Sequence, residues 1–170
     1  MAKTPKAAII MGSDSDYPVL EPCVALLRKF GVEVEAMVCS AHRTPEKAAA
    51  FAREAERNGY EVIIAAAGKA AHLPGVLAAF TVLPVIGLPI LSSTLDGLDS
   101  LLSIVQMPAG IPVATVAING SENAALLAVQ IMGGAHPGLR ERMHAYKADM
   151  ADAVEAKDRK LQEKLKGIKA

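Results

Sequence analysis

Three short polar segments of the sequence carry side chains that can bind a ligand or move a proton. They are residues 12–16 (GSDSD), 40–45 (SAHRTP) and 67–75 (AGKAAHLPG). Each follows a run of residues typical of a strand. Because ligands bind at the carboxyl ends of the strands in an open parallel sheet, we expect the three segments to meet in one site.

Segment 12–16 offers two hydroxyls and two carboxylates at the start of a predicted helix. Asp14 and Asp16 suit the positive end of a helix dipole, but together they would repel a phosphate placed among them. We therefore expect the carboxylates to hold hydroxyl groups, such as those of a ribose, and Ser13 to help hold a phosphate. These side chains either bind a ligand or only cap the helix. The spacing matches no Walker or dinucleotide fingerprint, and with no histidine or third acid nearby we predict no metal site.

Segment 40–45 places His42 between Ser40 and Arg43. Histidine is the side chain best suited to give and take protons near neutral pH, so His42 is the candidate acid–base group. Arg43 can form a bidentate pair with a phosphate. The alternative is a loop histidine that only supports the next helix, with Thr44 as its N-cap. His72 is a weaker candidate, because a lone histidine in an apolar segment is more often structural.

The elements that must position these segments alternate along the chain. Strands are predicted at 7–11, 32–38, 61–68, 84–90 and 111–118, and helices at 18–30, 45–57, 72–80, 98–107 and 122–133. Five such repeats, with no linker between them, predict one α/β domain over residues 1–170, with helices on both faces of a parallel sheet.

Residues 138–168 predict a further, highly charged helix with one narrow apolar stripe. The stripe consists of Leu139, Met143, Tyr146, Met150, Val154, Leu161, Leu165 and Ile168. This helix either lies back on its own domain or reaches over a neighbouring subunit.

Composition excludes several classes of protein. The chain has 18 basic and 18 acidic residues and no basic cluster, which argues against binding to nucleic acid. Its two cysteines form no CxxC pair, which favours a reduced, cytoplasmic protein. Prolines and glycines interrupt the one long uncharged stretch, residues 70–95, so we expect no membrane span.

Taken together, the motifs MGSDSD, SAHRTP, AAHLPG, GLDSLLSIVQMPAGIPVATVAI and NAALLA resemble those of the N5-carboxyaminoimidazole ribonucleotide mutases of purine biosynthesis. The resemblance runs in order over residues 7 to about 132. It implies a flavodoxin-like three-layer fold, assembled as a homo-octamer. It also implies a reaction that moves a carboxylate from the exocyclic nitrogen of the imidazole to ring carbon C4, through trapped CO2 and without cofactor or metal.

The resemblance also implies roles for individual residues of this sequence. His42 falls on the catalytic histidine, and the nucleotide-binding positions fall on Ser13, Asp16 and Arg43. The residues matching loops that line the same pocket are Ser40, Gly68, Lys69, Ala70, His72 and Leu73.

One residue departs from the mutase pattern, because the family commonly has glycine where this chain has Lys69. A basic residue occurs there in related enzymes that carboxylate aminoimidazole ribonucleotide (AIR) directly with CO2. Those enzymes usually carry lysine at the position of Arg43 and lack the AAHLP sequence, so the sequence favours the mutase and keeps the carboxylase as the alternative. A second alternative is a non-catalytic nucleotide-binding module, which has no evident need for His42 beside Ser40 and Arg43.

Overall fold

A single parallel sheet organises the computed structural model, which describes residues 4–93 and 95–168. Its strands lie in the order β2-β1-β3-β4-β5. Their bounds are β1 Lys6–Met11, β2 Glu33–Val38, β3 Val62–Gly68, β4 Val85–Ile90 and β5 Ala114–Thr115. This is the strand order of the flavodoxin-like fold, and the predicted α/β architecture is confirmed.

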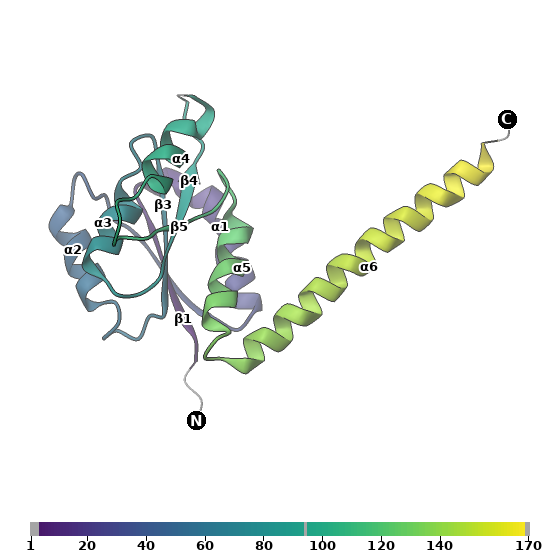
Figure 1. Ribbon diagram of the computed structural model, residues 1–170, viewed down its shortest axis with the longest axis horizontal. Helices are drawn as coiled ribbons and strands as arrows, with labels where there is room; N and C mark the ends of the chain where they lie inside the picture. Colours follow the sequence, from purple (N-terminus) through teal and green to yellow (C-terminus); the bar gives the residue numbers. More distant parts are fainter. Residues whose placement is uncertain (1–3, 94, 169–170) are drawn as a thin grey trace.

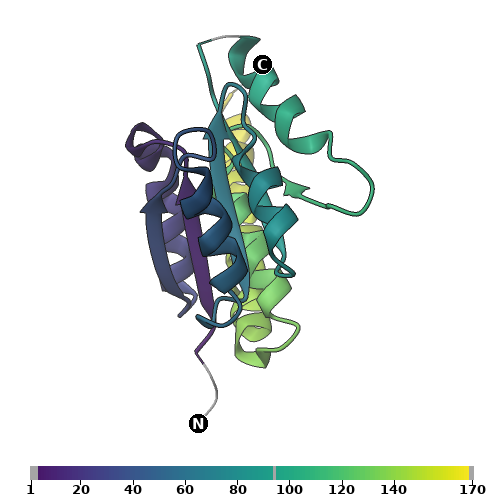
Figure 2. The ribbon, with the colours of Figure 1, turned by 90° about the vertical axis from the view of Figure 1, so that its left-hand side faces the viewer.

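Helices cover both faces of the sheet and complete three layers (Figure 1). On one face lie α1 (Tyr17–Lys29) and α5 (Ser121–Met132), and on the other lie α2 (Pro45–Glu54), α3 (Leu73–Phe80) and α4 (Leu98–Val105). Figure 2 looks onto this second face, with α2 in dark blue and α3 in teal in front of the strands. Two short 3₁₀ turns, η1 (Asp14–Asp16) and η2 (Leu95–Gly97), precede α1 and α4.

The central strands are apolar on both faces, as expected for a sheet covered on both sides. In β1, Ile9 enters the core beneath α1 and α5, while Ile10 enters the core beneath α2 and α3. In β3, Ile64 likewise enters the core beneath α1 and α5, and Ile63 enters the core beneath α2 and α3. Side chains alternate across a strand, so each strand contributes to two separate cores.

One sequence prediction is wrong in extent, and another is confirmed in position only. The predicted strand 111–118 is reduced to β5, which pairs with β4 only at Ile86 and Gly87. Pro112 lies in this run and has no N–H to donate to a ladder, so pairing starts after it. Thr44 is the N-cap residue of α2, as predicted, but its side chain makes no capping hydrogen bond, because its hydroxyl donates to the Ser40 carbonyl oxygen at 2.8 Å instead.

Helix α6 (Pro137–Gly167) begins against the domain and then extends away from it (Figure 1). At its start Leu139 is fully buried, and the ring of Tyr146 lies 5.7 Å from that of Phe30, centroid to centroid. Farther along, the stripe residues Met150, Val154, Leu161, Leu165 and Ile168 are all more than half exposed. The early part of the apolar stripe therefore serves its own domain, and the later part does not. None of the described helices is long and apolar enough to cross a membrane.

Gly87 in β4 marks the tightest packing between the sheet and α4. A Cβ atom there would lie 2.3 Å from Cγ2 of Ile104 and 2.8 Å from Cγ1 of Val113. We expect Gly87→Ala to lower the free energy of unfolding by about 1–3 kcal/mol, because both neighbours must move. Urea denaturation measures this, with Gly167→Ala as the control, since nothing lies within 4 Å of that Cβ position. A Gly87→Ala protein as stable as the unaltered protein would contradict the packing argument.

Candidate functional site

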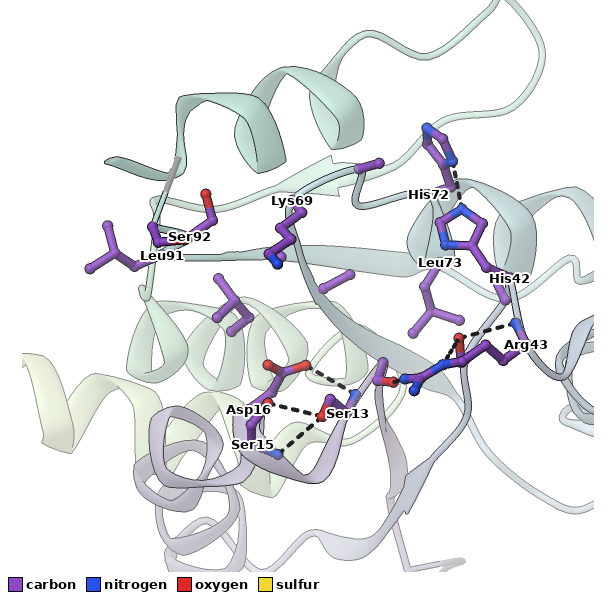
Figure 3. Close-up of a pocket in the computed structure, with 18 residues that line it drawn as sticks. Ser13, Ser15, Asp16, His42, Arg43, Lys69, His72, Leu73, Leu91 and Ser92 are labelled. Carbon is purple, nitrogen blue, oxygen red and sulfur yellow. Dashed lines mark hydrogen bonds between the residues drawn. The ribbon is translucent and has the colours of Figure 1, made fainter. Parts of the chain in front are cut away.

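A cavity of about 610 Å³ lies at the carboxyl ends of β1, β2, β3 and β4. Its lining comes from the last residues of β3 and β4 and from the loops that follow the four strands (Figure 3). The structure brings together all ten residues predicted from the sequence: Ser13, Asp16, Ser40, His42, Arg43, Gly68, Lys69, Ala70, His72 and Leu73. The three polar segments therefore meet in one pocket, as the predicted sheet required.

Ser13 and Asp16 form a reciprocal cap at the edge of this pocket. The backbone N–H of Ser13 donates to Oδ2 of Asp16 at 3.2 Å, and the backbone N–H of Ser15 donates to Oγ of Ser13 at 3.3 Å. Asp14 accepts from the Ser15 N–H at 3.1 Å but does not line the cavity. Capping and ligand binding are therefore not exclusive, because Ser13, Ser15 and Asp16 do the first while facing the pocket.

Asp16 is a carboxylate placed where water hardly reaches it. Only 9% of the residue is exposed. Burial raises the pKa of its carboxyl group above the ordinary 3.8, and hydrogen bonds from Ser13 and Ser15 oppose this shift without cancelling it. A ligand hydroxyl that donates to this carboxylate would supply a hydrogen bond that the free protein lacks.

His42 and His72 form a direct contact across the pocket. Nε2 of His42 lies 2.8 Å from Nδ1 of His72, with the rings edge to face at 80° (Figure 3). One of these nitrogens must carry a hydrogen and the other must accept it. The sequence interpretation of His72 as a weaker, structural candidate is thus incomplete, since His72 touches the candidate acid–base group.

Arg43 is held at the ends of β1 and β2. Its Nε donates to Oγ of Ser40 at 3.3 Å, and its Nη2 donates to the carbonyl oxygen of Gly12 at 3.2 Å. A guanidinium has five N–H donors, so further donors remain for an anion in the pocket. The two bonds fix the planar group at the rim before any ligand arrives.

Sequence reasoning missed the contribution of the loop after β4. Leu91, Ser92 and Ser93 of this loop line the cavity beside Ile90, the last residue of β4, and Oγ of Ser92 donates to Oδ1 of Asp99 at 2.8 Å. The signal was present, because these residues follow a predicted strand just as the three recognised segments do. Within residues 4–93 and 95–168, no three His, Cys, Asp or Glu side chains gather in a way that could hold a metal ion.

Comparison with known proteins gives consistent matches over nearly the whole chain. The family model described as AIR carboxylase matches residues 6–153. The N5-carboxyaminoimidazole ribonucleotide mutase of Pyrococcus horikoshii is 57% identical over 95% of this chain and 92% of its own length. The protein of that name from Mycobacterium tuberculosis is 58% identical over 93% and 91%. The crystal structure of Treponema denticola PurE superposes with a TM-score of 0.85 at 31% identity, covering 92% of this chain and 98% of that one.

Removing the buried charge of Asp16 should stabilise the protein. Because folding raises the pKa of this carboxyl group, the folded protein binds the proton more tightly than the unfolded chain does. Stability is therefore lost as the pH rises from 3.8 through the raised value, and at pH 7 the full loss is present. Asp16→Asn keeps an acceptor for the Ser13 N–H but carries no charge.

We expect Asp16→Asn to melt at a higher temperature than the unaltered protein at pH 7, with the difference vanishing below pH 3.8. Differential scanning calorimetry across this pH range measures it, and Asp14→Asn is the matched control outside the pocket. A clear fall in melting temperature at pH 7 would show that the charge itself holds the cap.

Proposed function

This chain belongs to the AIR carboxylase family, and from that membership and its pocket we propose that it is an N5-carboxyaminoimidazole ribonucleotide mutase. It converts the N5-carbamate of AIR into 4-carboxy-5-aminoimidazole ribonucleotide (CAIR) in purine biosynthesis. The observation that carries the proposal is the contact of His42 with His72 inside a pocket that also holds Ser13, Asp16 and Arg43.

The polar side of the pocket suits the ribose phosphate. Arg43 supplies a guanidinium already fixed by Ser40 and Gly12, and Ser13 supplies a hydroxyl next to it in the cavity lining. A phosphate bound there accepts charge-assisted hydrogen bonds from the arginine. The buried carboxylate of Asp16 then accepts from a ribose hydroxyl, which avoids placing two anions in contact.

The reaction needs one proton to be delivered and one to be removed. Breaking the N–C bond of the carbamate releases CO2, and the exocyclic nitrogen takes a proton from His42. Carbon C4 of the electron-rich ring then forms a bond to CO2, and the C4 proton returns to His42. The proton count balances over the cycle, so a single acid–base group suffices. His72 sets which nitrogen of His42 carries hydrogen, through the 2.8 Å contact.

Apolar side chains in the pocket favour retention of CO2. Ala67, Leu73 and Ile90 line the cavity beside the histidines and the polar groups, and all three are buried. CO2 is small and uncharged, so it gains more from such a wall than water does. Retention matters because CO2 that escapes leaves AIR as a dead-end product.

His42→Asn should abolish most of the mutase activity. Asparagine keeps some hydrogen bonding but cannot exchange a proton, and acid–base groups typically contribute about 10²–10⁴-fold to rate. The measurement is steady-state conversion of the carbamate, beside calorimetric binding of CAIR. For His42→Asn we expect lost turnover with retained binding of CAIR.

Arg43→Ala should instead weaken the binding of CAIR, by about 1.5–3 kcal/mol, because it removes a charge-assisted hydrogen bond.

The same assay separates the mutase from the alternatives. The unaltered protein should convert the carbamate and should not use AIR plus bicarbonate efficiently. The reverse preference would make it the direct carboxylase that Lys69 suggested, and binding without turnover of either would make it a nucleotide-binding module. A His42→Asn enzyme within about tenfold of the unaltered rate, below the usual range, would remove His42 from the mechanism.

We also propose that the protein acts in the cytoplasm as a homo-oligomer, an octamer by family resemblance. The exposed part of the α6 stripe supports this, because Met150, Val154, Leu161 and Leu165 are each more than half exposed in the single chain. Apolar side chains repeated along one helix face are typical of a surface that another subunit covers.

Replacing Val154 and Leu161 by glutamine should therefore weaken assembly. Each buried aliphatic side chain contributes about 1.5–3 kcal/mol at an interface, while Leu139 and Met143 stay in place to keep the domain core intact. Light scattering gives the mass of the assembly as a function of concentration. The control is Arg159→Gln with Glu163→Gln, which lie on the opposite side of the helix. An unchanged mass for Val154→Gln/Leu161→Gln would show that this stripe does not join subunits.

A further inference from the structure

Lys69 adopts a backbone conformation that lysine rarely takes. Its φ of 57° lies in the left-handed region, directly after β3 ends at Gly68. Glycine takes this conformation without steric cost, whereas a side chain with a Cβ atom does not. Of the described non-glycine residues with positive φ, Lys69 is the one that lines the pocket. A strained residue in a site is a reason to ask what its side chain does there.

The ammonium group of Lys69 is available to a ligand. Figure 3 shows the side chain directed into the pocket from the β3 side. Among the described residues nothing forms a hydrogen bond or ion pair with it. Other lysines of the chain differ: Nζ of Lys6 lies 2.6 Å from Oε1 of Glu35, and Nζ of Lys47 donates to the Val38 carbonyl oxygen at 2.8 Å. Lys69 thus brings an unpaired positive charge to the cavity.

The two cations of the pocket lie on different loops. Arg43 follows β2 and is bound to Ser40 and Gly12, on the side where Ser13 and Asp16 lie. Lys69 belongs instead to the loop after β3, three residues before His72, which contacts His42. A carboxylated aminoimidazole ribonucleotide also has two anionic groups, the phosphate and the carboxylate on the base.

We propose that Lys69 binds the migrating carboxylate, while Arg43 binds the phosphate. The inference rests on the proposed function, because it needs a substrate with both groups. The carboxylate is anionic on the exocyclic nitrogen and on C4, but it is neutral as CO2 between them. Lys69 therefore stabilises substrate and product more than the intermediate, and it selects carboxylated ligands over AIR. Such an interaction tightens the binding of substrate and product, and it raises rather than lowers the barrier from bound substrate to CO2.

The test compares two ligands that differ only in this carboxylate. Calorimetry measures binding of CAIR and of AIR to the unaltered protein, Lys69→Met and Lys69→Arg. Loss of a charge-assisted contact predicts roughly tenfold weaker binding of CAIR by Lys69→Met, with AIR little affected. Lys69→Arg should restore most of the preference for CAIR. The preference of the unaltered protein should also decline as salt is added, because the side chain is exposed.

A third variant separates the charge from the backbone. Lys69→Gly relieves the left-handed conformation and also lacks the ammonium, so it should lose the preference for CAIR as Lys69→Met does. Equal weakening of both ligands would mean that Lys69 serves the phosphate, and unchanged binding of both would mean that it serves neither; either result overturns the inference. If the unaltered protein neither bound CAIR nor converted the carbamate, the proposed function would fail, and this inference with it.

Discussion

Burial of the central strands on both faces confines the chemistry of this protein to the points where those strands end. Every residue of β4, and all but the terminal residue of β1 and β3, is buried between two layers of helices. A charged or hydrogen-bonding side chain in the middle of such a strand would lose its water without gaining a partner. Polar side chains become tolerable only past the carboxyl ends, where four loops surround one cavity.

The same constraint explains how much could be predicted from the sequence. Apolar runs that stop abruptly at GSDSD, SAHRTP and AGKAAHLPG predict both the strands and the place where their loops meet. The resemblance to the mutases, confirmed by the family match together with the relatives of that name, added the reaction. The features that could not be predicted from the sequence depend on the geometry of the loops. No periodicity reports that His72 reaches His42, that Lys69 is left-handed, or that Thr44 turns its hydroxyl to Ser40 instead of capping α2.

Several residues of the pocket are held in conformations or surroundings that lower the stability of the fold. Ser13 and Asp16 close the turn before α1, and the carboxylate that completes the cap is buried at a cost that raises its pKa. Lys69 keeps a conformation that glycine would hold more easily. Both features lower the stability of the fold, as strained and buried polar residues at functional sites often do. The fold tolerates this loss of stability because its two apolar cores are extensive and lie between the sheet and the helices, largely away from the pocket.

The contact between His42 and His72 has a consequence for the order of events as the chain folds. The two rings belong to loops after β2 and β3, and in the sheet β1 lies between those strands. The contact therefore forms only when three strands, brought together over long sequence separations, are in register. Parallel pairing of this kind is slow, because the chain loses loop-closure entropy before the distant segments form stabilising contacts. The contact between the two histidines therefore reports the pairing of β2, β1 and β3, and following it during refolding would reveal assembly of that part of the sheet rather than collapse of the chain.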